Sequence, residues 1–135
     1  MVQIAGKYQH ERSENIDEYF RTLGVPFLVR KMMSVSYPTL EISQDGDKFT
    51  LKTTTLIRTQ VSEFTLGVEY EESMASGVTL KNTTTLEGDS LITISISDDG
   101  NKVTRRYDFT DDGVVLTMSH ERSDQVAKRH FKRVQ

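Results

Sequence analysis

The sequence predicts an all-β domain, an antiparallel up-and-down β-barrel in which two short helices follow the first strand. From Asp47 onward, short runs of alternating apolar and polar residues are separated by turn residues about every eight to twelve positions. Threonine occurs 16 times and proline only twice, which favours strands over helices and long loops. Such a meander has two unpaired edges, and a chain of 135 residues removes them most simply by closing into a barrel.

The composition indicates one domain with an unusually polar interior or surface. A chain of 135 residues supports one hydrophobic core, so residues 1–135 are expected to form a single domain. Ala, Val, Ile, Leu, Met, Phe and Gly supply 51 of the 135 residues, or 38 %, below the roughly 45–50 % of a typical globular chain. Leu, Ile, Val and Phe alone supply 35 residues, too many for a disordered chain.

Helical periodicity is confined to the N-terminal third of the chain. Apolar residues recur there at helical spacing: Ile16, Tyr19, Phe20 and Leu23. Ser13 or Asn15 is expected to cap this helix, and Gly24 ends it. A second short helix begins near Pro26 and must stop before Pro38. Neither helix is long enough to be stable alone, so both are expected to lie on the sheet.

The later strands show period-two alternation, with turns at Asp45–Gly46, Glu87–Asp89, Asp98–Asn101 and Asp111–Gly113. Four faces stand out: Phe49, Leu51, Thr53, Thr55 and Ile57; Phe64, Leu66, Val68 and Tyr70; Ile92, Ile94 and Ile96; and Val114, Leu116 and Met118. A barrel of more than about eight strands is too wide for its side chains to fill. Inner faces that mix Phe, Leu and Ile with Thr therefore predict a cavity for water and an amphipathic ligand.

Several classes of function are disfavoured. The net charge of −3 gives no basic excess for nucleic acid, and the absence of cysteine excludes disulfides and thiolate metal sites. No signal peptide and no apolar run of roughly 18 residues is evident, so a cytoplasmic protein is expected. There is no G-x-S-x-G motif, and His120–Glu121 lacks the second histidine of H-E-x-x-H. We therefore expect no enzyme, no cofactor and no metal; His120 can face inward and His130 outward.

Five segments carry a resemblance to a known family: Gly6–Gly24 (GKYQHERSENIDEYFRTLG), Pro38–Thr39, Gly46–Asp47, Phe64–Glu72 (FTLGVEYEE) and Lys128–Arg133 (KRHFKR). Together they cover essentially the whole chain, which resembles the intracellular lipid-binding proteins, the fatty-acid-binding protein family. The resemblance implies a roughly ten-stranded barrel (β-clam) with a helix-turn-helix lid at about residues 15–36. It further implies a monomeric, non-catalytic carrier of one long-chain fatty acid.

Two positions depart from the family pattern and bear on the shape of the pocket. His10 stands where the family usually has an apolar residue, and Ile16 replaces the usual aromatic residue at the start of the first helix. A retinoid or another hydrophobic ligand stays open within the same fold. So does a protein that interacts with membranes or partners and uses its ligand as a switch.

In the family, two arginines on late strands and a tyrosine two residues after the second hold the ligand carboxylate. Arg129 matches the second arginine, and Phe131 occupies the place of the tyrosine, so the phenolic donor is missing there. The first arginine is ambiguous, because the surrounding run is one residue longer than the family pattern. Counting forward selects Arg106; counting back selects Tyr107, with Arg105 on the same inward face. We expect Arg106 or Arg105 as the first anchor, with Tyr107 near enough to replace the lost hydroxyl.

By the same resemblance, the cavity residues along the ligand tail are Ile16, Tyr19, Phe20, Val25, Val29, Met33, Pro38, Thr53, Thr55, Ile57, Ala75, Leu116, Met118 and Phe131. Many of these positions would also serve as ordinary core residues. Four basic residues, Arg21, Arg30, Lys31 and Arg58, would cluster at the lid and the turn beside it. Such a rim could steer fatty-acid carboxylates and contact anionic membranes, or could simply be a solvated face.

Overall fold

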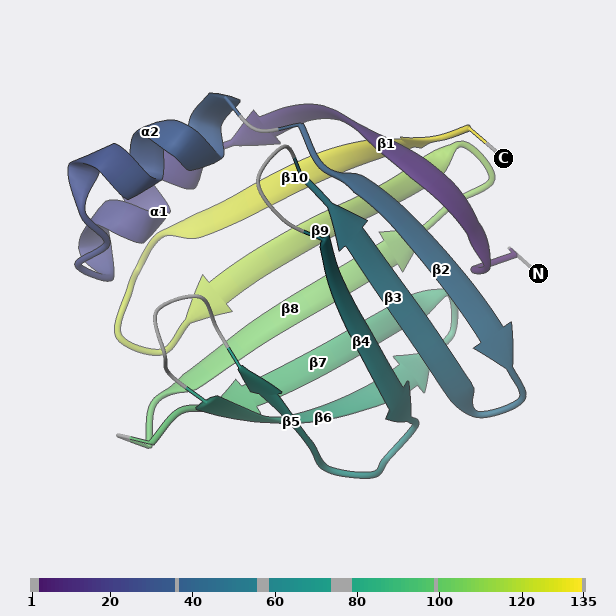
Figure 1. Ribbon diagram of the computed structural model, residues 1–135. Coiled ribbons are helices and arrows are strands. Elements are labelled where there is room, and N and C mark those ends of the chain that lie inside the picture. The colour runs from purple at the N-terminus through teal and green to yellow at the C-terminus, as the bar shows by residue number, and fades with distance from the viewer. Residues whose placement is uncertain (1–2, 36, 56–58, 74–78, 99, 135) are drawn as a thin grey trace.

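The computed structural model describes residues 3–35, 37–55, 59–73, 79–98 and 100–134. The elements follow in the order β1 (Gly6–Glu14), α1 (Ile16–Thr22), α2 (Phe27–Val35), β2 (Thr39–Asp45), β3 (Lys48–Thr54), β4 (Thr59–Thr65), β5 (Tyr70–Ser73), β6 (Thr79–Glu87), β7 (Ser90–Ile96), β8 (Lys102–Phe109), β9 (Gly113–His120) and β10 (Val126–Arg133) (Figure 1). No helix in these ranges is both long and apolar enough to cross a membrane.

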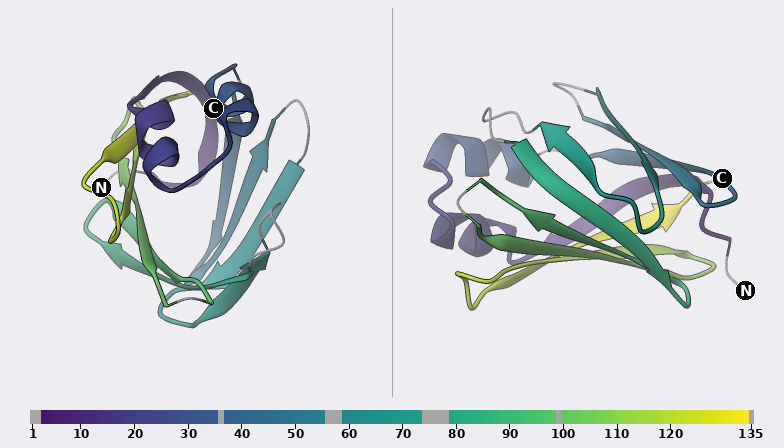
Figure 2. Two further views of the ribbon diagram at one scale, coloured as in Figure 1. Left: turned by 90° about the vertical axis from the view of Figure 1, so that its left-hand side faces the viewer. Right: turned by 90° about the horizontal axis from the view of Figure 1, so that it is seen from below.

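Ten antiparallel strands form one sheet in the order β4-β3-β2-β1-β10-β9-β8-β7-β6-β5. Strand β1 pairs with both β2 and β10, so the first and last strands of the chain lie side by side. The sheet curls into a barrel, and the two helices lie over one end of it (Figure 2). Strands β4 and β5 are its two edges. The predicted all-β barrel, with about ten strands and a helical lid after the first strand, is confirmed.

The two helices differ in how they meet the barrel. Ile16 and Tyr19 of α1 are buried. Asn15 precedes α1 with a left-handed backbone (φ 57°), but its side chain donates to the carbonyl of Val126 at 3.0 Å instead of capping the helix. Helix α2 lies beside α1 (Figure 2), and an ion pair of 2.9 Å between Arg30 and Asp17 joins them. The expected position of α1 on the barrel is thus met, whereas α2 leaves much of its apolar surface exposed.

Aromatic side chains pack together inside the barrel at the end opposite the helices. Phe49 follows the β2–β3 turn and stacks on Phe64 at 5.7 Å between ring centroids, and Phe64 stacks on Tyr70 at 5.1 Å. Because Phe64 lies on β4 and Tyr70 on β5, this second stack spans the gap between the two edge strands. Phe109 at the β8–β9 turn contacts Tyr8 of β1 at 6.0 Å. These rings close the base of the barrel.

Two predicted strand faces need correction. The alternating run from Phe64 to Tyr70 is not one strand, because β4 ends at Thr65 and a turn exposes Val68. On β7, the expected inward isoleucines face outward: Leu91, Thr93 and Ser95 are buried on the inner face, and Ile96 is 48 % exposed. A shift of one residue moves every side chain of a strand to the other face, and the outer surface of this barrel tolerates isoleucine.

Candidate functional site

Strand β8 places two of the predicted site residues inside the barrel. Tyr107 is buried, and the Arg105 side chain is 22 % exposed. Arg106 lies between them on the outer face, where its Nε donates to Asp108 Oδ1 at 2.9 Å and its side chain is 48 % exposed. Neighbouring residues of a strand point to opposite faces, so Arg105 and Arg106 cannot both face inward. The expectation that Arg106 reaches the interior is therefore not met, and Arg105, its alternative, takes that place.

Arg105 is paired with a buried carboxylate. Its Nη2 donates to Glu72 Oε1 at 2.7 Å, and the Glu72 side chain is 9 % exposed. Glu72 also accepts from Asn82 Nδ2 at 2.8 Å and from Gln60 Nε2 at 2.9 Å. Arg105 Nη2 further donates to Ser95 Oγ at 3.1 Å. Five strands, β4 to β8, thus each supply one member of a polar network inside the barrel.

The electrostatics keep this charge pair ionised at neutral pH. Burial by itself would raise the pKa of the Glu72 carboxyl, because a buried charge loses its hydration. The positive charge of Arg105 and the hydrogen bonds from Arg105, Asn82 and Gln60 more than offset burial, so the pKa of Glu72 lies below its usual value. A charged pair with several donors is the arrangement in which buried ions are tolerated in proteins.

A chain of hydroxyl groups extends the polar wall. Tyr70 and Thr84 hydroxyls lie 2.9 Å apart, and Thr84 and Thr93 hydroxyls 2.7 Å apart. Thr84 and Asn82 are fully buried on β6. Asn82 Oδ1 is buried and has no hydrogen-bond partner in the described part of the chain. Inward threonine, asparagine and serine side chains thus account for much of the low apolar content of the sequence.

Strand β10 adds Arg129 and Phe131 to the inner face. Arg129 and Tyr107 both register with Leu116 of β9, from opposite sides, so these predicted residues lie in one row across the wall, separated by Leu116. Burial lowers the pKa of Arg129. Phe131 is buried and meets the His10 ring edge-on at 5.6 Å. No hydroxyl can therefore come from position 131 itself.

The histidine of β10 faces outward, as the alternation predicts, and the histidine of β1 faces inward. His130 faces out and bonds to the Glu14 carboxylate. His10 is buried on the inner face, where its Nε2 lies 2.7 Å from Ser13 Oγ. Burial lowers the pKa of His10, and the nearby Arg129 adds to this effect, so His10 is neutral at pH 7. The polar residue at this family position is thus accommodated as an uncharged ring against Phe131.

The predicted tail residues fall into three groups. Buried on the inner face or beneath the helices are Ile16, Tyr19, Pro38, Leu116, Met118 and Phe131, and half-buried are Phe20, Val25, Thr53 and Thr55. Val29 of α2 is 44 % exposed, so its predicted place in the cavity is wrong. Ile57 and Ala75 lie outside the described residues, as does the side chain of Met33.

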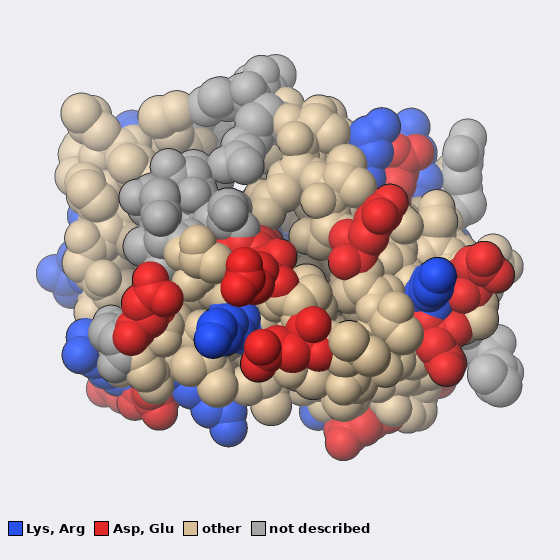
Figure 3. All heavy atoms as spheres, turned by 60° about the horizontal axis from the view of Figure 1, so that its bottom comes forward, with Lys and Arg blue, Asp and Glu red and all other residues tan. Residues whose placement is uncertain are grey.

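Two of the four residues of the predicted basic rim are paired with carboxylates. Arg21 donates to Glu18 at 2.5 Å and Arg30 to Asp17 at 2.9 Å, so two of the four cations pair with carboxylates of α1. Lys31 is exposed, and Arg58 lies outside the described residues. Carboxylates also gather on the face that carries β4 to β6, where Glu63, Glu69, Glu71 and Glu87 are exposed (Figure 3).

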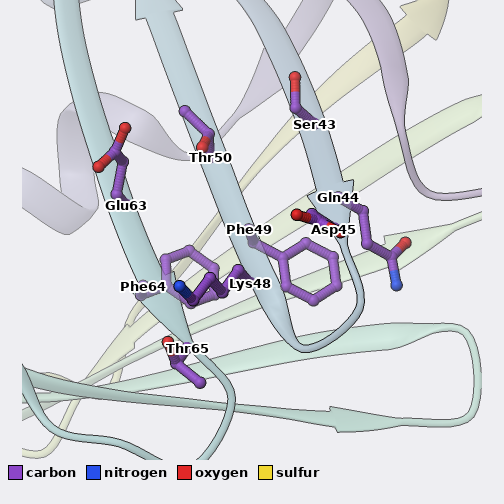
Figure 4. Close-up of a pocket in the computed structure, with 9 residues that line it drawn as sticks. All are labelled: Ser43, Gln44, Asp45, Lys48, Phe49, Thr50, Glu63, Phe64 and Thr65. Atoms are coloured by element: carbon purple, nitrogen blue, oxygen red, sulfur yellow. The ribbon is translucent and has the colours of Figure 1, made fainter.

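Described residues line two grooves at the surface. One, of about 410 Å³, lies beside the β2–β3 turn (Figure 4). Its lining combines Ser43, Thr50 and Glu63, which register with one another, with Phe49 and Phe64, and it shares no residue with the polar network. The other, of about 320 Å³, lies between the edges of β4 and β5 and includes Gln60 and Glu72. The interior network therefore borders the gap between the edge strands.

Comparisons with known proteins agree with this architecture. A family model described as Lipocalin / cytosolic fatty-acid binding protein family matches residues 5–133. A fatty acid-binding protein of Tyrophagus putrescentiae is 34 % identical over 117 residues, covering 87 % of this chain and 88 % of the relative. Cellular retinoic acid-binding protein 1 of Gallus gallus is 33 % identical over 138 residues, covering 98 % and 99 %. A solved structure of a Schistosoma mansoni fatty acid binding protein in complex with arachidonic acid aligns with a TM-score of 0.88 at 25 % identity, covering 97 % of this chain and 96 % of that one.

Because Arg105 lies on the inner face and Arg106 on the outer face, replacing them should lower the free energy of unfolding by different amounts. Arg105→Gln leaves the Glu72 carboxylate buried without its cation, and we expect a loss of about 3 kcal/mol in the free energy of unfolding. Arg106→Gln removes a half-exposed ion pair and should cost less than about 1 kcal/mol. Urea unfolding of both variants at pH 7 measures the two losses. Equal losses would contradict the placement.

Proposed function

The chain belongs to the lipocalin / cytosolic fatty-acid binding protein family, and from this membership we propose that it is a non-catalytic cytoplasmic carrier that binds one long-chain fatty acid inside the barrel. The observation that carries the proposal is a pair of arginines, Arg105 and Arg129, on the inner wall of a barrel whose base is closed by aromatic rings. A fatty acid needs a cationic anchor for its carboxylate and an apolar wall for its tail, and both are present.

The anchor combines the guanidinium of Arg129 with one hydroxyl. Arginine keeps its charge when buried and offers paired donors to a carboxylate, so Arg129 suits this task, whereas Arg105 on the same wall is paired with Glu72. The Tyr107 hydroxyl replaces the donor that Phe131 lacks, because Tyr107 and Arg129 flank the same residue of β9. Leu116 and Met118 of β9, with Ile16 and Tyr19 of α1, form apolar wall for the tail. The flexible Met118 accommodates chains of different length and saturation.

Titration with oleate tests the proposal. We expect one saturable site per chain, and Arg129→Gln should weaken oleate binding at least about tenfold, since it removes a buried cation from the wall. Arg106→Gln is the matched control, because Arg106 lies on the outer face and its loss should leave the affinity unchanged. Calorimetry on lipid-free protein measures both. Retinoic acid as a competitor separates the two ligand classes, and a preference for it over oleate would reassign the ligand within the family.

We also propose that α2 contacts anionic membranes when ligand is transferred. The supporting observation is apolar: Phe27, Leu28, Val29 and Met32 are 44 to 74 % exposed on one short helix. Partial burial of such side chains in the membrane interface supplies a favourable contact. The carboxylates over β4 to β6 oppose contact through that other face (Figure 3). The contact therefore depends on apolar burial more than on the basic rim, of which Arg21 and Arg30 are already paired.

The rate of transfer of a fluorescent fatty acid to anionic vesicles tests the role of α2. The double variant Phe27→Ser/Leu28→Ser should transfer at least about fivefold more slowly, because it removes the two most exposed of the apolar side chains that the structure describes on this helix. Val68→Ser, at an exposed apolar position between β4 and β5, is the control and should transfer at the original rate. The membrane contact is refuted if both variants slow transfer equally or if neither variant slows it.

A further inference from the structure

The interior cation on β8 already has an anion. Arg105 donates to Glu72 at 2.7 Å, and Glu72 is held in place by two further donors, Asn82 at 2.8 Å and Gln60 at 2.9 Å. Both side chains of the pair are largely buried, at 22 % and 9 % exposure. The local net charge at this part of the wall is therefore zero, and Arg105 offers an incoming anion much less attraction than an isolated guanidinium would.

A ligand carboxylate could bind at Arg105 in two ways, and both are energetically unfavourable. If it shares the guanidinium with Glu72, two negative charges lie side by side in a poorly hydrated interior, where like charges repel strongly. If it displaces Glu72, three hydrogen bonds to that carboxylate are broken and a buried charge loses its partner. Either course lowers the affinity for an anionic head group at this position.

An uncharged head group meets no such cost. Asn82 Oδ1 is buried and has no hydrogen-bond partner among the residues that the structure describes, and it belongs to the same side chain that donates to Glu72. A hydroxyl or amide N–H can donate to this oxygen or to the Glu72 carboxylate without adding charge. A hydrogen bond to a buried acceptor that otherwise has no partner stabilises the complex more than a hydrogen bond that merely replaces one to water.

We propose that Glu72 is a specificity-determining residue of the interior site: as the counter-ion of Arg105 it disfavours a carboxylate there and, with Asn82, favours a head group that donates a hydrogen bond. The inference rests on the proposed role of the barrel as a lipid carrier and deepens it. A fatty acid then depends on Arg129 for its charge interaction. A long-chain alcohol or primary amide uses the Glu72–Asn82 side of the wall.

The test compares oleate with oleyl alcohol on the lipid-free full chain by calorimetry at pH 7.4. Glu72→Gln keeps the size and shape of the side chain but removes its charge and leaves Arg105 without a counter-ion, so oleate should bind about tenfold more tightly. Oleyl alcohol should bind no more tightly than to the unchanged chain. Glu71→Gln, on the adjacent exposed position of β5, is the matched control and should change neither affinity. Oleate binding that stays equal or weakens in Glu72→Gln overturns the inference.

A second variant keeps the test decisive if Glu72→Gln does not fold. The double change Glu72→Gln/Arg105→Gln removes both charges and leaves the interior neutral, as it is now. We expect its oleate affinity to stay within about threefold of the unchanged chain. A loss of about thirtyfold or more would mean that Arg105 attracts the carboxylate despite Glu72, and would overturn the inference. If the unchanged chain binds neither ligand, the proposed function fails and this inference fails with it. If the chain binds oleate with an affinity that does not change in Glu72→Gln, only this inference is refuted.

Discussion

The pairing of β1 with both β2 and β10 decides what the rest of the molecule can do, because it turns a meander into a barrel with an inside. Once the sheet is closed, every second residue of each strand must point into the enclosed space. On β8 this rule buries Arg105 and Tyr107 and exposes Arg106. The register of the strands thus determines which side chains lie inside the barrel. A shift of β8 by one residue would turn Arg105 and Tyr107 outward and Arg106 inward.

The sheet does not continue from β4 to β5 in the described residues, and side chains span that gap where backbone hydrogen bonds do not. Gln60 of β4 donates to Glu72 of β5, and the rings of Phe64 and Tyr70 stack across the same gap. Glu72 therefore has two tasks. It helps to hold the barrel edges together, and it neutralises Arg105 within the site. Ligand preference and closure of the barrel are coupled through this one carboxylate.

Much of the architecture could be predicted from the sequence, because turn residues and period-two alternation are strong local signals. The helices after the first strand followed from helical spacing and from the glycine and proline residues that bound them, whereas the inward Arg129 and Phe131 followed from the resemblance to the family. The choice between Arg105 and Arg106 could not be made with certainty, because a strand with one extra residue has two possible alignments and only the pairing of β8 with β7 and β9 selects one. Val29 was misplaced because the resemblance to the family does not determine which face of a lid helix is turned to solvent in this chain.

The network around Glu72 was missed for a different reason. A glutamate in an acidic stretch normally lies on the surface, and nothing local marks Glu72 as buried. The available signal was its period-two spacing from Tyr70, which faces inward, together with the low apolar content of the whole chain. That low content is now explained in part by the interior positions of Thr84, Thr93, Asn82 and Ser95.

The central claim is that Glu72 is an ionised, buried partner of Arg105. The pH titration of the Glu72 side-chain carboxyl carbon by NMR, with Glu72→Gln used to assign the signal, tests this claim most directly. The account predicts a pKa below the 4.5 of an unperturbed glutamate, because the charge of Arg105 and three hydrogen bonds outweigh burial. A pKa above 4.5 would contradict this prediction, and a pKa above neutral pH would mean that Glu72 is uncharged and is not the counter-ion of Arg105.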